Sequence, residues 1–91
     1  MLSHTKMDML TPMQLRAARA LVGWSREELA EKAGIAAVTV RAFELLGADS
    51  KQSTILKMRR AIEAAGVELL DEDQTKGAGA RMRYPSNKSK R

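Results

Sequence analysis

The sequence predicts a mainly α-helical fold, with four short helices followed by a β-strand or β-hairpin. Apolar residues recur at intervals of three and four positions in four segments, which is typical of helices with one buried face. A glycine follows each of these segments, and glycine is common where a helix ends. After the last of these glycines, two short runs lack helical periodicity, and the second alternates with period two, as strands do.

The composition limits the class of protein. The chain has 91 residues, enough for one domain with a single small core. It contains no cysteine, which excludes disulfides, thiolate zinc sites and cysteine nucleophiles. No apolar run approaches the ~20 residues needed to cross a bilayer, and the first residues lack the pattern of a signal peptide. We therefore expect a cytoplasmic protein that does not bind membranes.

The net charge of +5 is concentrated at one end of the chain. Residues 81–91 contain five basic residues and no acidic one, so the remainder, with 11 of each sign, is neutral. Residues 11–67 carry nine basic and six acidic side chains, and an acidic cluster from residue 68 to residue 73 offsets them. The globular part is thus mildly basic, and the tail either follows phosphates electrostatically or is a solubilising disordered end.

The first helix is expected to begin at Thr11 and Pro12 and to end at Gly23. A threonine hydroxyl can cap a helix, and proline costs no hydrogen bond at the first helical position. The residues expected on its inner face are Leu15, Ala18 and Val22, with Arg19 and Leu21 alongside.

Residues 25–44 predict two short helices that meet at a tight turn. Ser25 and Glu28 have the spacing of a capping box, in which each side chain accepts a hydrogen bond from the other residue's backbone amide. Gly34 ends the first of these helices, because such a bend favours a residue in the left-handed conformation. The expected inward residues are Leu29, Ala30 and Ala33 in the first helix and Ile35, Val40 and Phe43 in the second.

The rest of the chain predicts a fourth helix and a hairpin. The helix is expected from about residue 51 or 53 to residue 65, with Asp49 or Ser50 as its cap. Residues 67–70 and 80–84 are interpreted as strands that pair across a polar loop. Because an isolated hairpin is marginal in water, we expect its outer edge to pair with a second copy or to pack on the fourth helix. In that helix Ile55, Met58, Ile62 and Ala65 are expected to face inward, and Lys57, Arg59, Arg60 and Glu63 to face water.

At residues 25–44 the chain resembles the Cro and phage-repressor (XRE-like) family of helix-turn-helix DNA-binding proteins. Ala30, Gly34 and Val40 lie at the three positions where that motif tolerates only a small residue, a glycine and a medium apolar residue. The resemblance covers roughly residues 11–66 and implies a four-helix Cro/repressor-like domain. It further implies that the second motif helix enters the major groove of double-stranded DNA.

We therefore divide the chain into four parts. They are a flexible N-terminal segment at 1–10, a helix-turn-helix DNA-binding domain at 11–66, a β-hairpin and possible dimerisation element at 67–84, and a basic disordered tail at 85–91.

The resemblance also implies the site residues. Ser25 and Arg26 would anchor a phosphate, since the free amides at a helix start favour an anion. Lys51 is the basic residue that the loop after the motif offers to DNA. Arg19 and Glu44 match a pair that commonly bridges the first helix to the end of the recognition helix. The positions implied to face the groove are Ala36, Ala37, Val38, Thr39, Arg41 and Ala42.

These groove-facing positions depart from the family's usual pattern. Ala36 stands where a polar cap is usual, and small apolar side chains replace long polar ones. Arg41 is the only one able to make a strong bidentate contact to guanine or grip a phosphate, Thr39 can hydrogen-bond to either, and the others can only touch thymine methyl groups. Since one bidentate contact supplies about 1–3 kcal/mol of discrimination, we expect a homodimer on a short inverted repeat.

Two functions remain open. The first is a transcriptional regulator acting as a repressor, which the intact motif and its arginines favour. The second is a protein-interaction module, an antitoxin-like or antiactivator subunit that contacts a partner protein through Leu45 and Leu46, which the neutral core and alanine-rich face favour. No enzyme, cofactor or metal site is expected, because the acidic residues of the motif lie on a helix exterior with no histidine or cysteine to join them.

Overall fold

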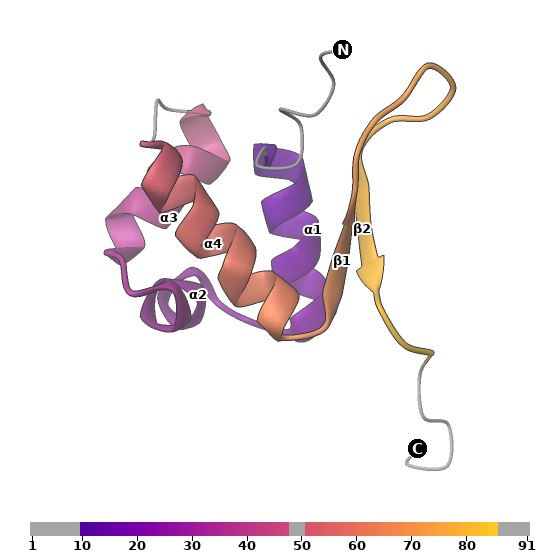
Figure 1. The fold of residues 1–91 in the computed structure, drawn as a ribbon. Helices are drawn as coiled ribbons and strands as arrows, with labels where there is room; N and C mark the ends of the chain where they lie inside the picture. The colour runs from indigo at the N-terminus through magenta and orange to yellow at the C-terminus, as the bar shows by residue number, and fades with distance from the viewer. Residues whose placement is uncertain (1–9, 48–50, 86–91) are drawn as a thin grey trace.

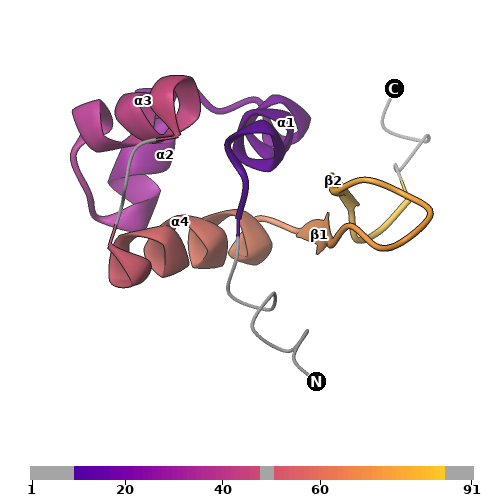
Figure 2. The same cartoon turned by 90° about the horizontal axis from the view of Figure 1, so that it is seen from above.

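The computed structural model describes residues 10–47 and 51–85. Within them the mainly α-helical fold predicted from the sequence is confirmed. The elements are α1 (Pro12–Val22), α2 (Arg26–Ala33), α3 (Ala37–Leu46), α4 (Gln52–Ala64), β1 (Val67–Leu70) and β2 (Gly79–Met82). Figures 1 and 2 show α1 between helices α2 and α3 on one side and the antiparallel hairpin of β1 and β2 on the other, with α4 leading directly into β1.

Capping boxes fix the starts of α1 and α2. The Thr11 hydroxyl accepts the Gln14 amide at 3.0 Å, and Gln14 Oε1 accepts the Thr11 amide at 3.0 Å. Ser25 and Glu28 form the box predicted for α2, with the Glu28 amide 3.0 Å from the Ser25 hydroxyl and the Ser25 amide 2.7 Å from Glu28 Oε1. Both helices therefore begin where local sequence dictates.

The starts of α3 and α4 have no side-chain cap. Ala36 and Lys51 occupy the two N-cap positions, and neither side chain makes a capping hydrogen bond. Lys51 is the N-cap of α4, whereas Asp49 or Ser50 was expected there; these two residues lie outside the described ranges. On the same helix Arg59 does not face water as expected, because its side chain is only 13% exposed and pairs with Glu63 at 3.1 Å.

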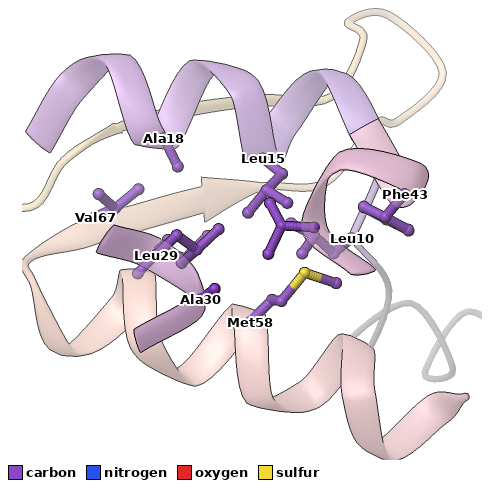
Figure 3. Packing of buried hydrophobic residues seen from close by; sticks show 10 residues of the cluster. Leu10, Leu15, Ala18, Leu29, Ala30, Phe43, Met58 and Val67 are labelled. Carbon is purple, nitrogen blue, oxygen red and sulfur yellow. The ribbon is translucent and has the colours of Figure 1, made fainter. Parts of the chain in front are cut away.

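The core is enclosed by the four helices and β1. Figure 3 shows Leu15, Leu29 and Met58 converging from α1, α2 and α4. Leu10, before α1, and Val67, in β1, are also buried, so the core reaches beyond residues 11–66 at both ends. The buried apolar residues are Leu10, Leu15, Ala18, Leu29, Ala30, Val40, Phe43, Met58, Ile62 and Val67.

The hairpin packs mainly on α1, and it also contacts α4 as one expectation had it: β1 packs against that helix, and Arg83 Nη2 donates to the Glu63 carbonyl at 3.1 Å. Val67 lies opposite Met82, and Leu69 lies opposite Ala80. Strand β2 ends at Met82, two residues before the end predicted from the sequence. The reason is that the partner strand β1 begins only after Gly66, where a φ of 101° turns the chain. The last hydrogen bond between the two segments therefore joins the Arg83 amide to the Gly66 carbonyl at 2.7 Å.

Gln14 fastens the hairpin to α1. Its side-chain nitrogen donates to the carbonyl of Leu70 at 2.9 Å and to the carbonyl of Gly79 at 3.0 Å. These two residues lie opposite each other at the loop end of the sheet. The buried amide therefore caps α1 with its oxygen and holds both strands with its nitrogen, which explains how a polar side chain is accommodated in the interior.

Candidate nucleic-acid interface

The turn between α2 and α3 sets the direction of α3. Gly34 adopts a left-handed conformation with φ 73°, which other residues rarely adopt. Its amide donates to carbonyls at the end of α2, and the Ile35 amide bonds to the Ala30 carbonyl at 3.0 Å. The chain thus leaves α2 in a fixed direction and begins α3 after three intervening residues.

Helix α3 has a buried face and an exposed face. Val40, Phe43 and Glu44 are buried, whereas Val38 is 69% exposed and Arg41 is also exposed. Residues three positions apart lie on the same side of a helix, so these two side chains are neighbours. No hydrogen bond or ion pair joins Arg41 to any other residue of the described chain. The helix therefore presents an apolar side chain next to a guanidinium that has no partner in the part of the chain that the structure describes.

The six residues expected to face a groove divide into three groups. Ala36, Val38 and Arg41 are exposed, Thr39 and Ala42 are half-buried, and Ala37 packs against the core. Ala37 falls on the buried side because Val40 and Glu44 follow it at three and seven positions, which is one helix face. The exposed face of α3 is therefore narrower than the resemblance implied.

The start of α2 contributes Ser25, which is exposed, and Arg26, whose side chain is 30% exposed. Arg26 Nε donates to Glu44 Oε1 at 2.9 Å. This is the one hydrogen bond that Arg26 makes within the described residues, so its two terminal nitrogens have no protein acceptor there. Lys51 is exposed at the start of α4.

Glu44 is the buried acceptor that joins three helices. It takes hydrogen bonds from Arg19 Nε at 2.7 Å and Arg19 Nη2 at 2.9 Å, so the ion pair implied for Arg19 and Glu44 is present. Burial alone would raise the pKa of Glu44, but the hydrogen bonds and positive charges of Arg19 and Arg26 outweigh it and hold the pKa below its ordinary value of 4.5. The same contact raises the pKa of Arg19. The carboxylate is therefore fully ionised at neutral pH.

Sequence reasoning missed two members of this cluster. Arg16 Nη1 donates to the backbone carbonyl of Glu44 near the end of α3. Arg26 was assigned to a phosphate alone, yet it also bonds to Glu44. The sequence carried only a weak signal for these contacts. Arg16 and Arg19 are three positions apart and so share one side of α1. Only the tertiary fold brings Arg26 of α2 within reach of Glu44.

Residues 10–47 and 51–85 contain neither a metal-binding cluster nor a helix that could span a membrane. No group of three or more histidine, cysteine, aspartate or glutamate residues there is placed to hold a metal ion. None of the helices in these ranges combines the length and apolar character needed to cross a membrane.

The chain matches a known protein family over more than half of its length. A family model described as helix-turn-helix matches residues 15–69, from within α1 to within β1. A search of curated proteins found none that matches the chain. The matched segment contains the whole exposed face of α3, the start of α2 and all the residues around Glu44.

Proposed function

Because this chain belongs to the Cro/XRE-type helix-turn-helix family, whose members bind DNA and are not enzymes, we propose that it is a transcriptional repressor that binds a short inverted repeat as a homodimer. DNA binding follows from the family. The observation that supports our reading of the site is the exposed face of α3, where Val38 and Arg41 lie next to each other.

In the proposed complex the first two turns of α3 lie in the major groove. Val38 and Arg41 approach base edges, while Ser25 and Arg26 meet a phosphate at the start of α2. Unpaired backbone amides at a helix start favour an anion, and the terminal nitrogens of Arg26 add a full charge. Lys51, at the exposed start of α4, supplies a further phosphate contact.

The Glu44 cluster supports this proposal by fixing the two contact points relative to each other. Arg19 belongs to α1, Arg26 to α2 and Glu44 to α3, and all three side chains are bonded together. A phosphate contact sets the position of a protein on the duplex, and base contacts then read the sequence. A rigid link between α2 and α3 therefore keeps the base-reading side chains in register with the backbone.

The homodimer follows from the small number of base-reading groups. Arg41 is the only exposed side chain among the six groove-facing candidates that can form a bidentate contact. One such contact gives about 1–3 kcal/mol of discrimination, whereas specific sites exceed non-specific binding by about 4–10 kcal/mol. Two copies on an inverted repeat double the number of contacts, which gives about 2–6 kcal/mol and reaches the lower part of that range.

The test is a fluorescence-anisotropy titration of the full chain on duplex DNA from upstream of its own gene, over a series of salt concentrations. We expect selective binding compared with a scrambled duplex. Arg26→Ala should reduce the slope of log affinity against log salt by about one, because one phosphate contact is lost. Arg60→Ala is the matched control, since Arg60 is an exposed arginine on α4 outside the proposed interface.

Two results would count against the repressor. Equal and weak binding to both duplexes would remove sequence-specific recognition. An Arg26→Ala slope identical to that of Arg60→Ala would show that Arg26 only braces Glu44 and touches no phosphate.

A second candidate function is binding of a partner protein through α3. The observation that favours it is the apolar exposure at the end of this helix, where Leu45 is 51% and Leu46 is 77% exposed. Exposed apolar clusters commonly mark protein contacts. This candidate predicts that Leu46→Ala leaves DNA affinity unchanged. It is supported only if the titration described above shows no selective DNA binding.

A further inference from the structure

The exposed stripe of α3 combines one charged and several apolar groups. Val38, Arg41 and Leu45 are exposed and Ala42 is half-buried, and they follow one another at helical spacing. Resting on the proposed DNA binding, we propose that this stripe selects a half-site in which a thymine methyl group, contacted by Val38, lies within two base pairs of a guanine contacted by Arg41.

Val38 is suited to a methyl group and to nothing else in the groove. Its side chain is 69% exposed and lies in the first turn of α3, the part that enters the groove deepest. A hydrocarbon cannot hydrogen-bond, and the only apolar feature of the major-groove edges is the thymine C5-methyl. Against any other base edge Val38 would displace water from a polar group without replacing its hydrogen bond, which carries a cost.

Arg41 is suited to guanine because it is uncommitted. Arg16, Arg19 and Arg26 all bond to Glu44, whereas Arg41 has no partner among the described residues. A free guanidinium can donate two hydrogen bonds to guanine O6 and N7. Its charge needs no rearrangement of the protein before it binds.

The spacing of the two contacts follows from helix geometry. Residues three positions apart rise about 4.5 Å along a helix axis. Successive base pairs are about 3.4 Å apart. Val38 and Arg41 therefore reach the same, adjacent or next base pair, so the thymine and the guanine must lie close together in the half-site.

The experiment begins with selection of bound sequences from a random duplex pool by the full chain. Each thymine of the selected half-site is then replaced by deoxyuridine, which lacks only the methyl group. Replacement at the contacted position should weaken binding about fourfold, the value for one buried methyl-sized group. In Val38→Ala the thymine and uracil duplexes should bind alike.

Leu21→Ala is the matched control, because Leu21 is an exposed apolar residue on α1 outside the stripe. It should keep the wild-type ratio of thymine to uracil affinity. Val38→Ala replaces an exposed side chain, so its helix content by circular dichroism should match that of the wild type.

The outcomes separate the inference from the function on which it rests. Selected half-sites that bind equally well with uracil at every position would overturn the methyl contact and leave DNA binding intact. A Val38→Ala variant that loses affinity for both duplexes but keeps their ratio would also contradict it. If no sequence is enriched at all, the proposed function itself fails, and the thymine contact with it.

Discussion

The Glu44 carboxylate accepts three hydrogen bonds from two arginines while its side chain is fully buried. A buried ion pair is weak evidence for stability, because desolvation offsets much of the attraction between the charges. The cluster matters here because its three members come from α1, α2 and α3, so it fixes the angle of α3 relative to the other two helices. Removing one partner leaves an uncompensated charge in the interior.

The pH dependence of stability should reveal this carboxylate. The pKa of Glu44 in the folded chain lies below its ordinary value of 4.5, so the folded state favours the ionised form. Its stabilising contribution is therefore fully present above pH 4.5 and is lost as the pH falls through the folded-state pKa. Urea unfolding followed by circular dichroism should show a free energy of unfolding that declines below that pH.

Glu44→Gln should flatten this decline, since glutamine does not titrate. The comparison variant is Asp73→Asn, because hydrogen bonds from the Thr75 and Lys76 amides also lower the pKa of Asp73. Asp73 is exposed in the hairpin loop, so its replacement should change the profile less. A Glu44→Gln profile as steep as that of the wild type would mean that other groups cause the acid sensitivity.

At the scale of elements, one side chain of α1, Gln14, makes hydrogen bonds to both strands of the hairpin. Replacing Gln14 by methionine keeps its size but leaves the Leu70 and Gly79 carbonyls without their donor. We expect a loss of about 1–3 kcal/mol in the free energy of unfolding, the usual penalty for a buried group without its partner. Hydrogen exchange at the β1 amides should accelerate in parallel, since the sheet is held less firmly.

Two controls separate the two roles of Gln14. Thr11→Ala breaks the capping box and spares the hairpin contacts, so β1 exchange should stay near the wild-type rate. Gln14→Glu keeps the acceptor for the Thr11 amide but turns a carboxylate toward two carbonyls, so it should destabilise at least as much as methionine. Unchanged exchange in both Gln14 variants would show that apolar packing alone holds the hairpin.

The helices and the hairpin were predictable because their signals are local. Ser25 and Glu28 cap α2 through residues three positions apart, and Gly34 ends that helix by its own backbone preference. The docking of the hairpin was not predictable, because Gln14 contacts residues 56 and 65 positions away. A glutamine three residues after a threonine indicates a cap and says nothing about distant carbonyls.

The local features of the candidate site were also predictable, whereas its long-range contacts were not. The motif places Val38 and Arg41 on an outward face, and the structure has both exposed. It also led us to count Ala37 on that face, and the structure has this residue half-buried against the core. The second arginine partner of the Glu44 carboxylate, Arg26, could not be inferred, because an arginine at a helix start suits a phosphate and a buried carboxylate equally well.

At the scale of the whole molecule, the charges on the hairpin affect whether two copies of the chain can pair along the β2 edge. The β2 edge carries Arg81, which pairs with Glu68 of β1 at 3.0 Å, and Arg83 lies just beyond the strand. A second copy paired along that edge would bring a second set of these arginines to it. Helix α3 lies on the other side of α1 from the hairpin (Figure 1). We therefore expect the two copies of the proposed dimer to associate on DNA rather than through the β2 edge.

Analytical ultracentrifugation of the full chain tests this expectation. Without DNA the chain should sediment as a monomer at micromolar concentration. With an inverted-repeat duplex two copies should bind, and with a single half-site only one. A stable dimer in the absence of DNA would contradict the argument from the β2 edge, and one copy on the full repeat would contradict the homodimer.

The hydrogen bond between Gln14 and Gly79 also determines when, during synthesis of the chain, the fold can be completed. Val67 of β1 is part of the buried core, and β2, which Gln14 holds, ends at residue 82. Helices α1 to α4 therefore leave the ribosome before the two strands that pack against them. Until then the hairpin side of α1 is uncovered, and the nascent chain offers that surface to chaperones and proteases. Premature termination between α4 and β2 should therefore yield fragments that are degraded rather than a smaller working domain.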